Sequence, residues 1–267
     1  MNPGINHNVP EDEYHAFRAV SKSTLWSFAK NPSKWKKLED AGIRREPTAS
    51  MQWGSLVDAM LLQPEEVERS FAVSPYDDFR TKDAKAWRDA ETRTVITQST
   101  FDSAKAAADS VLSNPIAGDV LSGAETQVSV LVEGDETQTG ERFLAKCRID
   151  IVPGEPFASW VFDLKTTQSL SDMDRTIANF GYHVQAAWYL DMYNAAAGEA
   201  RSQWGFVFVE SEFPYETAVV ELDPLAIERG REWYLGALAK WCKCHRDGKF
   251  PSPFDGEIPV ISLPKWA

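Results

Sequence analysis

The stretch between residues 147 and 189 places the tightest constraint on how this chain folds. It opens inside RFLAKCRIDIV, continues through a PGEP turn into SWVFDLKTT, and ends in helical segments. In both strand-like segments apolar and polar residues alternate with the period of a half-buried β-strand. Asp150 lies on the polar face of the first strand, and Asp163 and Lys165 share the polar face of the next. Because a short turn joins the two strands, we expect these side chains to point into one cleft.

The helix that follows adds a polar face to the same region. Residues 171–180 and 182–197 are predicted to be helical. On the second helix Tyr182, Gln185 and Tyr189 stand at positions i, i+3 and i+7, so they lie on one side. Each of these signals is weak alone. The ordered set of an acid, an acid with a lysine two positions on, and a glutamine–tyrosine helix face is much more specific.

The remaining segments predict a mixed α/β fold. A strand begins at residue 125, two more (QWGFVFVE and YETAVVEL) follow the helices, and an amphipathic helix runs from 223 to about 246. We expect one domain over residues 1–267, with a mixed central β-sheet flanked by helices and a helical N-terminal part. Its expected parts are a flexible segment (1–18), a mainly helical region (19–120), the sheet with its helices (121–222), and a C-terminal helix with a tail (223–267).

Composition agrees with a packed domain and argues against a membrane protein. The chain has 267 residues, 43% of them hydrophobic, which is enough to bury a sizeable core. No apolar run of about 18 residues occurs, and the polar, acidic N-terminus lacks the apolar centre of a signal peptide. We therefore expect a cytoplasmic protein. Its three cysteines cannot build a disulfide framework, and the Cys242-x-Cys244-His245 segment lacks the second half of a metal site.

Two carboxylates and a lysine in this arrangement suit the hydrolysis of a phosphodiester bond. Mg²⁺ prefers oxygen ligands from one or two carboxylates, water and phosphate, and it is the expected ion, with Mn²⁺ as a substitute. Asp150 and Asp163 are the expected ligands, with the backbone carbonyl of Leu164 as a further one. We expect Lys165 to orient or deprotonate the attacking water, and to have a depressed pKa because it lies between a metal and a phosphate.

Four other residues are candidates to complete this site. Glu125 opens the first strand of the sheet, and Asp58 lies inside an apolar helix, where an unpaired charge is costly. Either acid could hold a second ion if the fold brings it near, and Glu125 is also a candidate for the catalytic set. Gln185 is expected to hydrogen-bond the nucleophilic water or a phosphate oxygen, and Tyr189 to assist it or to bond the backbone.

The most basic stretch lies in the N-terminal helical region. Lys30, Lys34, Lys36 and Lys37 are interleaved with tryptophans, and together with Ser23 they are the candidates for contact with a DNA backbone. A solvated helix face explains the same residues equally well. The net charge of −12 counts against a nucleic-acid-binding protein, although a local basic channel can hold DNA while the outer surface stays acidic.

Taken together, Asp150, Asp163-Leu164-Lys165 and Gln185-Ala-Ala-Trp-Tyr189 resemble the motifs of the PD-(D/E)xK nuclease superfamily. Within it they are similar to the RecB-like branch, whose helix after the Asp/Glu-x-Lys strand carries Gln-x-x-x-Tyr. The segments SKSTLWSFAKNPSKWK, MQWGSLVDAMLLQPEEVERSFAV and ISLPKWA extend the likeness to RecE-like (exonuclease VIII) nucleases and their phage relatives. The resemblance covers nearly the whole chain from residue 14.

This resemblance implies a Mg²⁺-dependent exonuclease that degrades linear double-stranded DNA from its ends in the 5′→3′ direction. The product would be a 3′ single strand for recombination, passed to a single-strand annealing protein of the RecT type. Relatives form closed rings around DNA, which implies a homo-oligomeric ring here. One position departs from the family: many relatives carry His where this chain has Asp58, which leaves the metal preference of the second site open.

Other interpretations remain open at this stage. A PD-(D/E)xK endonuclease would cut a covalently closed circle, and a single-strand exonuclease would act on a different DNA end. A catalytically silent DNA-binding recombination scaffold on the same fold would bind DNA without cutting it. An α/β domain unrelated to nucleic acids, for which the charge of −12 is the best support, would not bind Mg²⁺.

Overall fold

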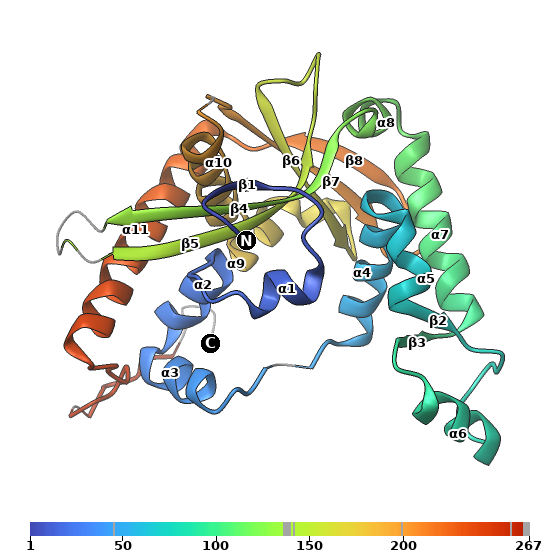
Figure 1. The fold of residues 1–267 in the computed structure, drawn as a ribbon, viewed down its shortest axis with the longest axis horizontal. Helices are drawn as coiled ribbons and strands as arrows, with labels where there is room; N and C mark the ends of the chain where they lie inside the picture. Colours follow the sequence, from blue (N-terminus) through green and yellow to red (C-terminus); the bar gives the residue numbers. More distant parts are fainter. Residues whose placement is uncertain (45, 136–139, 141, 199, 257, 264–267) are drawn as a thin grey trace.

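The computed structural model describes residues 1–44, 46–135, 140, 142–198, 200–256 and 258–263. Its centre is a six-stranded sheet in the order β1-β4-β5-β6-β7-β8, in which β6 and β7 are parallel and the other neighbours are antiparallel (Figure 1). The strands are β1 (Gly4–Asn6), β4 (Glu125–Asp135), β5 (Arg142–Val152), β6 (Trp160–Thr167), β7 (Gln203–Glu210) and β8 (Thr217–Glu221). A separate parallel pair consists of β2 (Phe71–Val73) and β3 (Thr94–Ile96).

Short polar side chains begin many of the helices. Ser21 caps α2 and Asn31 caps α3, each accepting a hydrogen bond from a backbone N–H three residues on. The α-helices are α1 (Glu11–Ala16), α2 (Lys22–Lys30), α3 (Pro32–Asp40), α4 (Ala49–Leu62), α5 (Val67–Ser70), α6 (Lys82–Ala90), α7 (Gln98–Ser113), α8 (Pro115–Leu121), α9 (Met173–Phe180), α10 (Tyr182–Ala197) and α11 (Pro224–Asp247). Two short 3-10 helices are η1 (Pro64–Glu66) and η2 (Leu170–Asp172).

Helices cover both faces of the sheet (Figure 1). Along β7, Trp204, Phe206 and Phe208 pack into one core with residues of α2, α10 and α11. Val207 and Val209 of the same strand pack on the opposite side with residues of α4, α7 and α8. A strand that is apolar on both faces is typical of a sheet enclosed between two helical layers. The predicted fold, a mixed central sheet flanked by helices, is confirmed.

The N-terminal segment departs from the expectation that residues 1–18 are flexible. β1 pairs with β4 at the edge of the sheet. Lys146 of β5, which is only 7% exposed, donates from Nζ to the carbonyl oxygens of Tyr14 (2.6 Å) and Phe17 (2.7 Å). Charged donors bind carbonyl groups strongly. A lysine far away in the sequence therefore holds the backbone of this segment in place. The polar composition of the segment does not predict this contact.

Two further expectations concern the thiols and the membrane. Cys147, Cys242 and Cys244 are all buried, and none of them forms a disulfide bond with another described residue. Within the described part of the chain, no helix combines the length and the hydrophobicity needed to cross a bilayer.

Candidate active site

The candidate site forms where β5 and β6 separate. The pair Ile151 and Phe162 joins the two strands in register. Beyond it the Leu164 N–H donates to Oδ2 of Asp150 at 3.0 Å, so a side-chain carboxylate takes the place of a backbone acceptor. Further along, β5 bonds instead to Val20, which precedes α2. The carboxylate of Asp150 therefore lies at the point where the sheet opens.

Asp163 is the most buried acidic side chain of this site. It is only 1% exposed, and its two oxygens have different partners. Oδ1 accepts a hydrogen bond from the side-chain amide of Gln185 on α10, which is 8% exposed. Oδ2 forms an ion pair with the ammonium of Lys165. The structure thus brings Asp150, Asp163, Lys165 and Gln185 together, and the tight packing of α10 on the sheet fixes the amide.

Asp58 of α4 reaches the same region. A Cβ placed on Gly54 would stand 3.0 Å from Oγ1 of Thr166, so α4 approaches β6 closely at this glycine. Asp58 follows one helical turn later on the same side of α4. Burial, together with the carboxylate of Asp163, raises the pKa of Asp58 to about 7, although Lys165 opposes the shift.

The three carboxyl groups of this cluster repel one another. Burial raises the pKa of Asp150 well above its ordinary value, and the nearby carboxylates of Asp163 and Asp58 raise it further. Lys165 is the cation that opposes both shifts. Burial alone would lower the pKa of Lys165, but Asp163 and Asp150 outweigh it and hold the pKa above its usual range. The depression of the Lys165 pKa expected beside a metal and a phosphate stays a prediction.

The donor set of the cluster fits a hard divalent ion. Asp58, Asp150 and Asp163 supply only oxygen atoms, which Mg²⁺ and Mn²⁺ prefer. Oδ2 of Asp163 is buried and faces the Lys165 ammonium, and the Leu164 carbonyl oxygen lies 3.4 Å from the same Nζ. In the described ranges, however, no three His, Cys, Asp or Glu side chains stand close enough together to enclose an ion. The residues present fit a cation that would neutralise the excess of acidic groups.

Two predicted site residues, Glu125 and Tyr189, make their contacts outside the acidic cluster. Glu125 lies at the exposed beginning of β4, where its Oε2 is 3.7 Å from Nδ1 of His7, and this contact does not involve the acidic cluster. Tyr189 is half-buried on α10 and packs edge-on against Trp204. Burial raises the pKa of the Tyr189 phenol, with further contributions that include Asp163 and Asp150. Tyr189 thus stands within electrostatic reach of the cluster.

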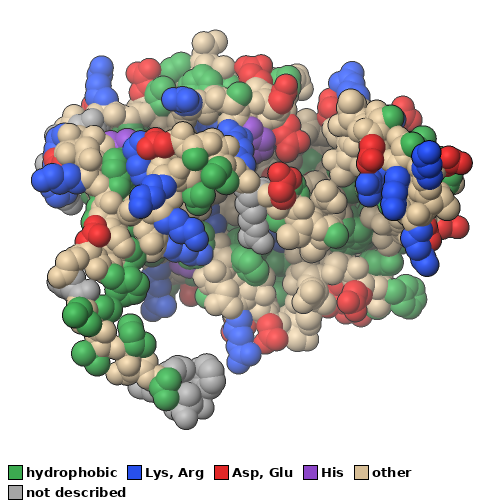
Figure 2. All heavy atoms as spheres, turned by 90° about the horizontal axis from the view of Figure 1, so that it is seen from below, with side chains coloured by type: hydrophobic (Ala, Val, Ile, Leu, Met, Phe, Trp, Pro, Cys, Tyr) green, Lys and Arg blue, Asp and Glu red, His purple; other side chains and the backbone are tan. Residues whose placement is uncertain are grey.

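The predicted DNA-contacting residues lie on α2 and α3, where Lys and Arg side chains gather at the left of the face shown in Figure 2. Lys30 lies 5.3 Å from the ring centroid of Trp26. Lys36 forms an ion pair with Asp40 of its own helix. Lys34 and Lys37 line a shallow hollow of the surface. The remaining candidate, Ser23, is an exposed residue of α2.

Sequence reasoning missed Lys22, whose ammonium interacts electrostatically with Lys165 and Asp163 of the acidic cluster. Its pKa is lowered to about 8, first by burial and then by the neighbouring charge of Lys165. The only available signal was its place one helical turn before Trp26, a spacing that allows the cation to lie over the indole.

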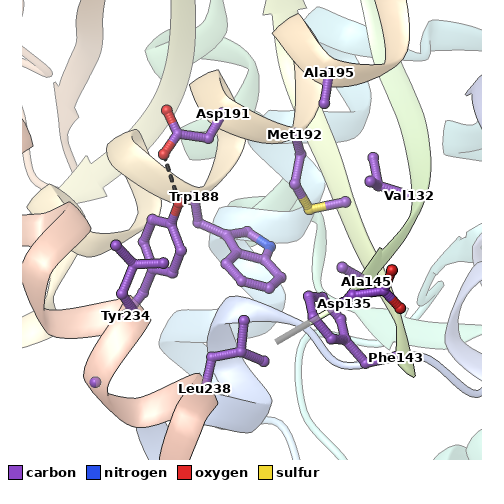
Figure 3. Close-up of a pocket in the computed structure, with 12 residues that line it drawn as sticks. Val132, Asp135, Phe143, Ala145, Trp188, Asp191, Met192, Ala195, Tyr234 and Leu238 are labelled. Atoms are coloured by element: carbon purple, nitrogen blue, oxygen red, sulfur yellow. Dashed lines mark hydrogen bonds between the residues drawn. The ribbon is translucent and has the colours of Figure 1, made fainter. Parts of the chain in front are cut away.

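An apolar pocket lies away from this site. A pocket of about 350 Å³ lies between the β4–β5 strands and helices α10 and α11 (Figure 3). Its lining is mainly apolar, with Trp188, Met192 and Leu238, and a hydrogen bond joins Tyr234 to Asp191 at its edge. None of the predicted site residues lines it. The chemistry of the charged cluster, not cavity size, marks the candidate active site.

Acidic residues on two diverging strands, a lysine two positions after one of them and a glutamine on the next helix define a PD-(D/E)xK-like protein. The chain belongs to the family described as "PDDEXK-like domain of unknown function (DUF3799)", whose pattern matches residues 15–257. A search of functionally curated proteins finds no match.

Among solved structures, the chain is similar to a protein from Eubacterium rectale named as a candidate exonuclease. The TM-score is 0.65 at 12% identity, over 97% of this chain and 96% of the other, so the likeness is one of fold. Weaker similarities are to SSO0001 (TM-score 0.31, 18% identity, 79% of this chain and 91% of the other) and to Rai1 of Scheffersomyces stipitis (TM-score 0.30, 11% identity, 91% and 69%). These two carry no argument here.

Proposed function

We propose that this protein is a metal-dependent deoxyribonuclease, and specifically an exonuclease that degrades linear double-stranded DNA in the 5′→3′ direction. The observation that carries the proposal is the buried carboxylate of Asp163, held by Gln185 and paired with Lys165 beside Asp150. Membership of a PDDEXK-like family supports a nuclease, as does the fold shared with the Eubacterium rectale protein. Duplex DNA ends and the polarity come from the resemblance to RecE-like nucleases.

We assign each residue of the cluster a different role in phosphodiester hydrolysis. A bound Mg²⁺ would supply Lewis-acid stabilisation of the charge that develops on the phosphate, and Asp150, Asp163, Asp58 and the Leu164 carbonyl are the groups that would hold it. Gln185 fixes the orientation of the Asp163 carboxylate through its hydrogen bond. We assign to Lys165 the positioning of the attacking water.

The roles of the outlying residues follow from their positions. Tyr189 lies on α10 one turn after Gln185, so we assign it a supporting role in orienting that amide or a phosphate oxygen. Glu125 would need to move from its contact with His7 to join the metal ligands, so we give it the weakest part of this proposal. Assembly into a ring and delivery of the 3′ strand to an annealing protein of the RecT type belong to the same proposal.

Digestion of a linear duplex labelled at one 5′ end tests the function. The wild-type protein is expected to release labelled mononucleotides with Mg²⁺, to stop with EDTA, and to leave a covalently closed circle intact. Asp163→Asn should reduce the rate by about a thousandfold or more, because it removes the charge that the metal requires. Asp119→Asn, an exposed site on α8, is the matched control and should cleave normally.

Each alternative has its own outcome in this assay. Cutting of the closed circle identifies an endonuclease, and release from single strands alone identifies a single-strand exonuclease. A folded protein that binds DNA but cuts none of these substrates would replace the nuclease with a silent scaffold.

A further inference from the structure

Lys22, the first residue of α2, is held in an unusual setting for a lysine. Its Nζ donates to the carbonyl oxygen of Phe180 at 2.8 Å. The same ammonium lies 5.1 Å from the ring centroid of Trp26 and 5.9 Å from that of Tyr182. No carboxylate forms an ion pair with it in the described part of the chain. Aromatic faces and one carbonyl are weak substitutes for an anion, so its positive charge is available to a ligand.

This ammonium stands next to the candidate active site. The ring of Tyr182 also lies 5.0 Å from Nζ of Lys165, so Lys22 and Lys165 approach the same aromatic ring. Lys165 is paired with Asp163. The ring of Tyr182 and the side chain of Lys165 therefore lie between Lys22 and the acidic cluster. This position suits a group that binds the substrate beside the reacting phosphate.

The backbone at this point is rigidly built. Gly181 joins α9 to α10 with φ of 64°, and a Cβ at this residue would come within 2.5 Å of the Trp26 ring. A side chain other than glycine would push α2 away, so close packing fixes both Trp26 and the Phe180 carbonyl that Lys22 binds. The cation is thus pre-organised.

An exposed aromatic side chain adjoins this cation. Phe180 is 59% exposed and stacks on Tyr182, with ring centroids 5.7 Å apart and an interplanar angle of 21°. Exposed aromatic rings beside basic side chains are typical of surfaces that bind single-stranded nucleic acid, where bases stack on the rings and cations contact the phosphates.

We propose that Lys22 binds the phosphate next to the scissile phosphodiester, and that the exposed ring of Phe180 stacks on a base of the same strand. This inference rests on the proposed nuclease function and names a substrate subsite for it. A purely structural role, in which Lys22 only ties α2 to the α9–α10 junction, is the competing explanation.

The variant Lys22→Gln separates the two explanations. Glutamine keeps a hydrogen-bond donor for the Phe180 carbonyl but removes the charge. Lys85→Gln removes one positive charge from exposed α6 and serves as the matched control for net charge. The probe is a short DNA duplex in which single phosphates near one 5′ end are replaced, one at a time, by neutral methylphosphonates.

Binding is measured by fluorescence anisotropy in EDTA, where no turnover occurs, and cleavage is measured separately with Mg²⁺. We expect Lys22→Gln to weaken binding about tenfold, the usual effect of losing a hydrogen bond to a charged group, and Lys85→Gln to have no effect. One methylphosphonate position should weaken wild-type binding by a similar factor and leave the Lys22→Gln variant unaffected.

The stacking half of the proposal has a parallel test. Phe180→Ala should weaken binding to the intact duplex about tenfold. It should cause no further loss on a duplex that carries an abasic residue at one position. Equal losses on intact and abasic DNA at every position would overturn the stacking role.

The results distinguish failure of the subsite from failure of the nuclease. If Lys22→Gln and Lys85→Gln bind alike, or if every methylphosphonate affects Lys22→Gln and wild type equally, the phosphate subsite is wrong while the nuclease stands. Position-specific loss in a protein that never cleaves would support the subsite and overturn the catalytic function. A protein that binds no DNA overturns both.

Discussion

At the scale of single residues, the ion pair between Lys165 and Asp163 is the centre of the site. Asp163 is almost completely enclosed, and Lys165 is the ammonium paired with it. Removal of one partner of a buried pair leaves an uncompensated charge. Lys165 therefore has two roles: it is the proposed positioning group for water in the reaction, and it is the cation that faces the carboxyl groups of Asp163, Asp150 and Asp58.

The first prediction concerns Lys165→Ala. In EDTA we expect the variant to lose about 3 kcal/mol of unfolding free energy, because the carboxylates lose their cation. Mg²⁺ should restore more stability to the variant than it adds to wild type, since the ion replaces the missing charge. Thermal unfolding with and without Mg²⁺ measures this. Lys105→Ala on the surface of α7 is the control. Equal responses of variant and wild type to Mg²⁺ would contradict a metal at this cluster.

The second prediction concerns pH. The folded protein holds a proton on Asp58 up to a pKa of about 7, whereas the unfolded chain releases it near the ordinary value of 3.8. Because the folded state binds more protons in this window, the stability of the metal-free protein should fall as the pH rises from 4 through 7. Mg²⁺ binding should strengthen over the same window and release protons.

Asp58→Asn tests the origin of this pH effect. Between pH 6 and pH 8 in EDTA the unfolding temperature of the variant should fall less than that of wild type, and the fall that remains is assigned to Asp150, whose pKa is also raised. Proton release on Mg²⁺ binding, measured by calorimetry in buffers of different ionisation enthalpy, should also decrease. An unchanged pH profile in the variant would assign the effect to Asp150 alone.

At the scale of secondary-structure elements, the site depends on the separation of β5 from β6. Beyond the point where β6 separates from it, β5 forms backbone hydrogen bonds with Val20. The buried Lys146 of β5 binds the segment that precedes α2. The N-terminal segment therefore completes the sheet on one side of the opening. Burial lowers the pKa of Lys146 to about 8, as expected for an ammonium whose partners are neutral carbonyl groups.

The third prediction follows from this contact. Lys146→Met keeps the aliphatic part of the side chain but removes the donor to Tyr14 and Phe17. We expect a loss of about 2 kcal/mol and rapid proteolysis within residues 1–18, because two carbonyl groups lose a charged partner. Limited proteolysis followed by mass spectrometry locates the cleavage. Intact residues 1–18 in a folded Lys146→Met protein would show that β1 alone holds the segment.

The contrast between sequence and structure is clearest at this scale. The strands around Asp150 and Asp163 and the helix with Gln185 were predictable because alternation and helical spacing are local signals. The edge strand β1 and the Lys146 contacts were not, because they join residues more than 120 positions apart. Glu125 shows the converse: it has the right residue type on the right strand, yet it faces His7 at the exposed end.

At the scale of the whole molecule, the net charge of −12 limits how DNA can be bound. Several surface lysines are already paired with an aspartate one turn away, in Lys36–Asp40, Lys105–Asp109 and Lys243–Asp247. Such lysines offer little to a phosphate. Lys22 and Lys30 instead lie over the ring of Trp26. Composition alone could not separate these two groups.

The last prediction is that DNA binding uses few phosphate contacts. With only Lys22, Lys30 and a small number of neighbours available, the logarithm of the affinity should fall with the logarithm of salt concentration with a slope of about −3. Lys22→Gln should reduce the magnitude of this slope by about one, and Lys105→Gln should leave it unchanged. Anisotropy titrations at several salt concentrations measure it. A slope of about −8 would contradict this prediction, because it requires a broad basic surface in contact with the DNA.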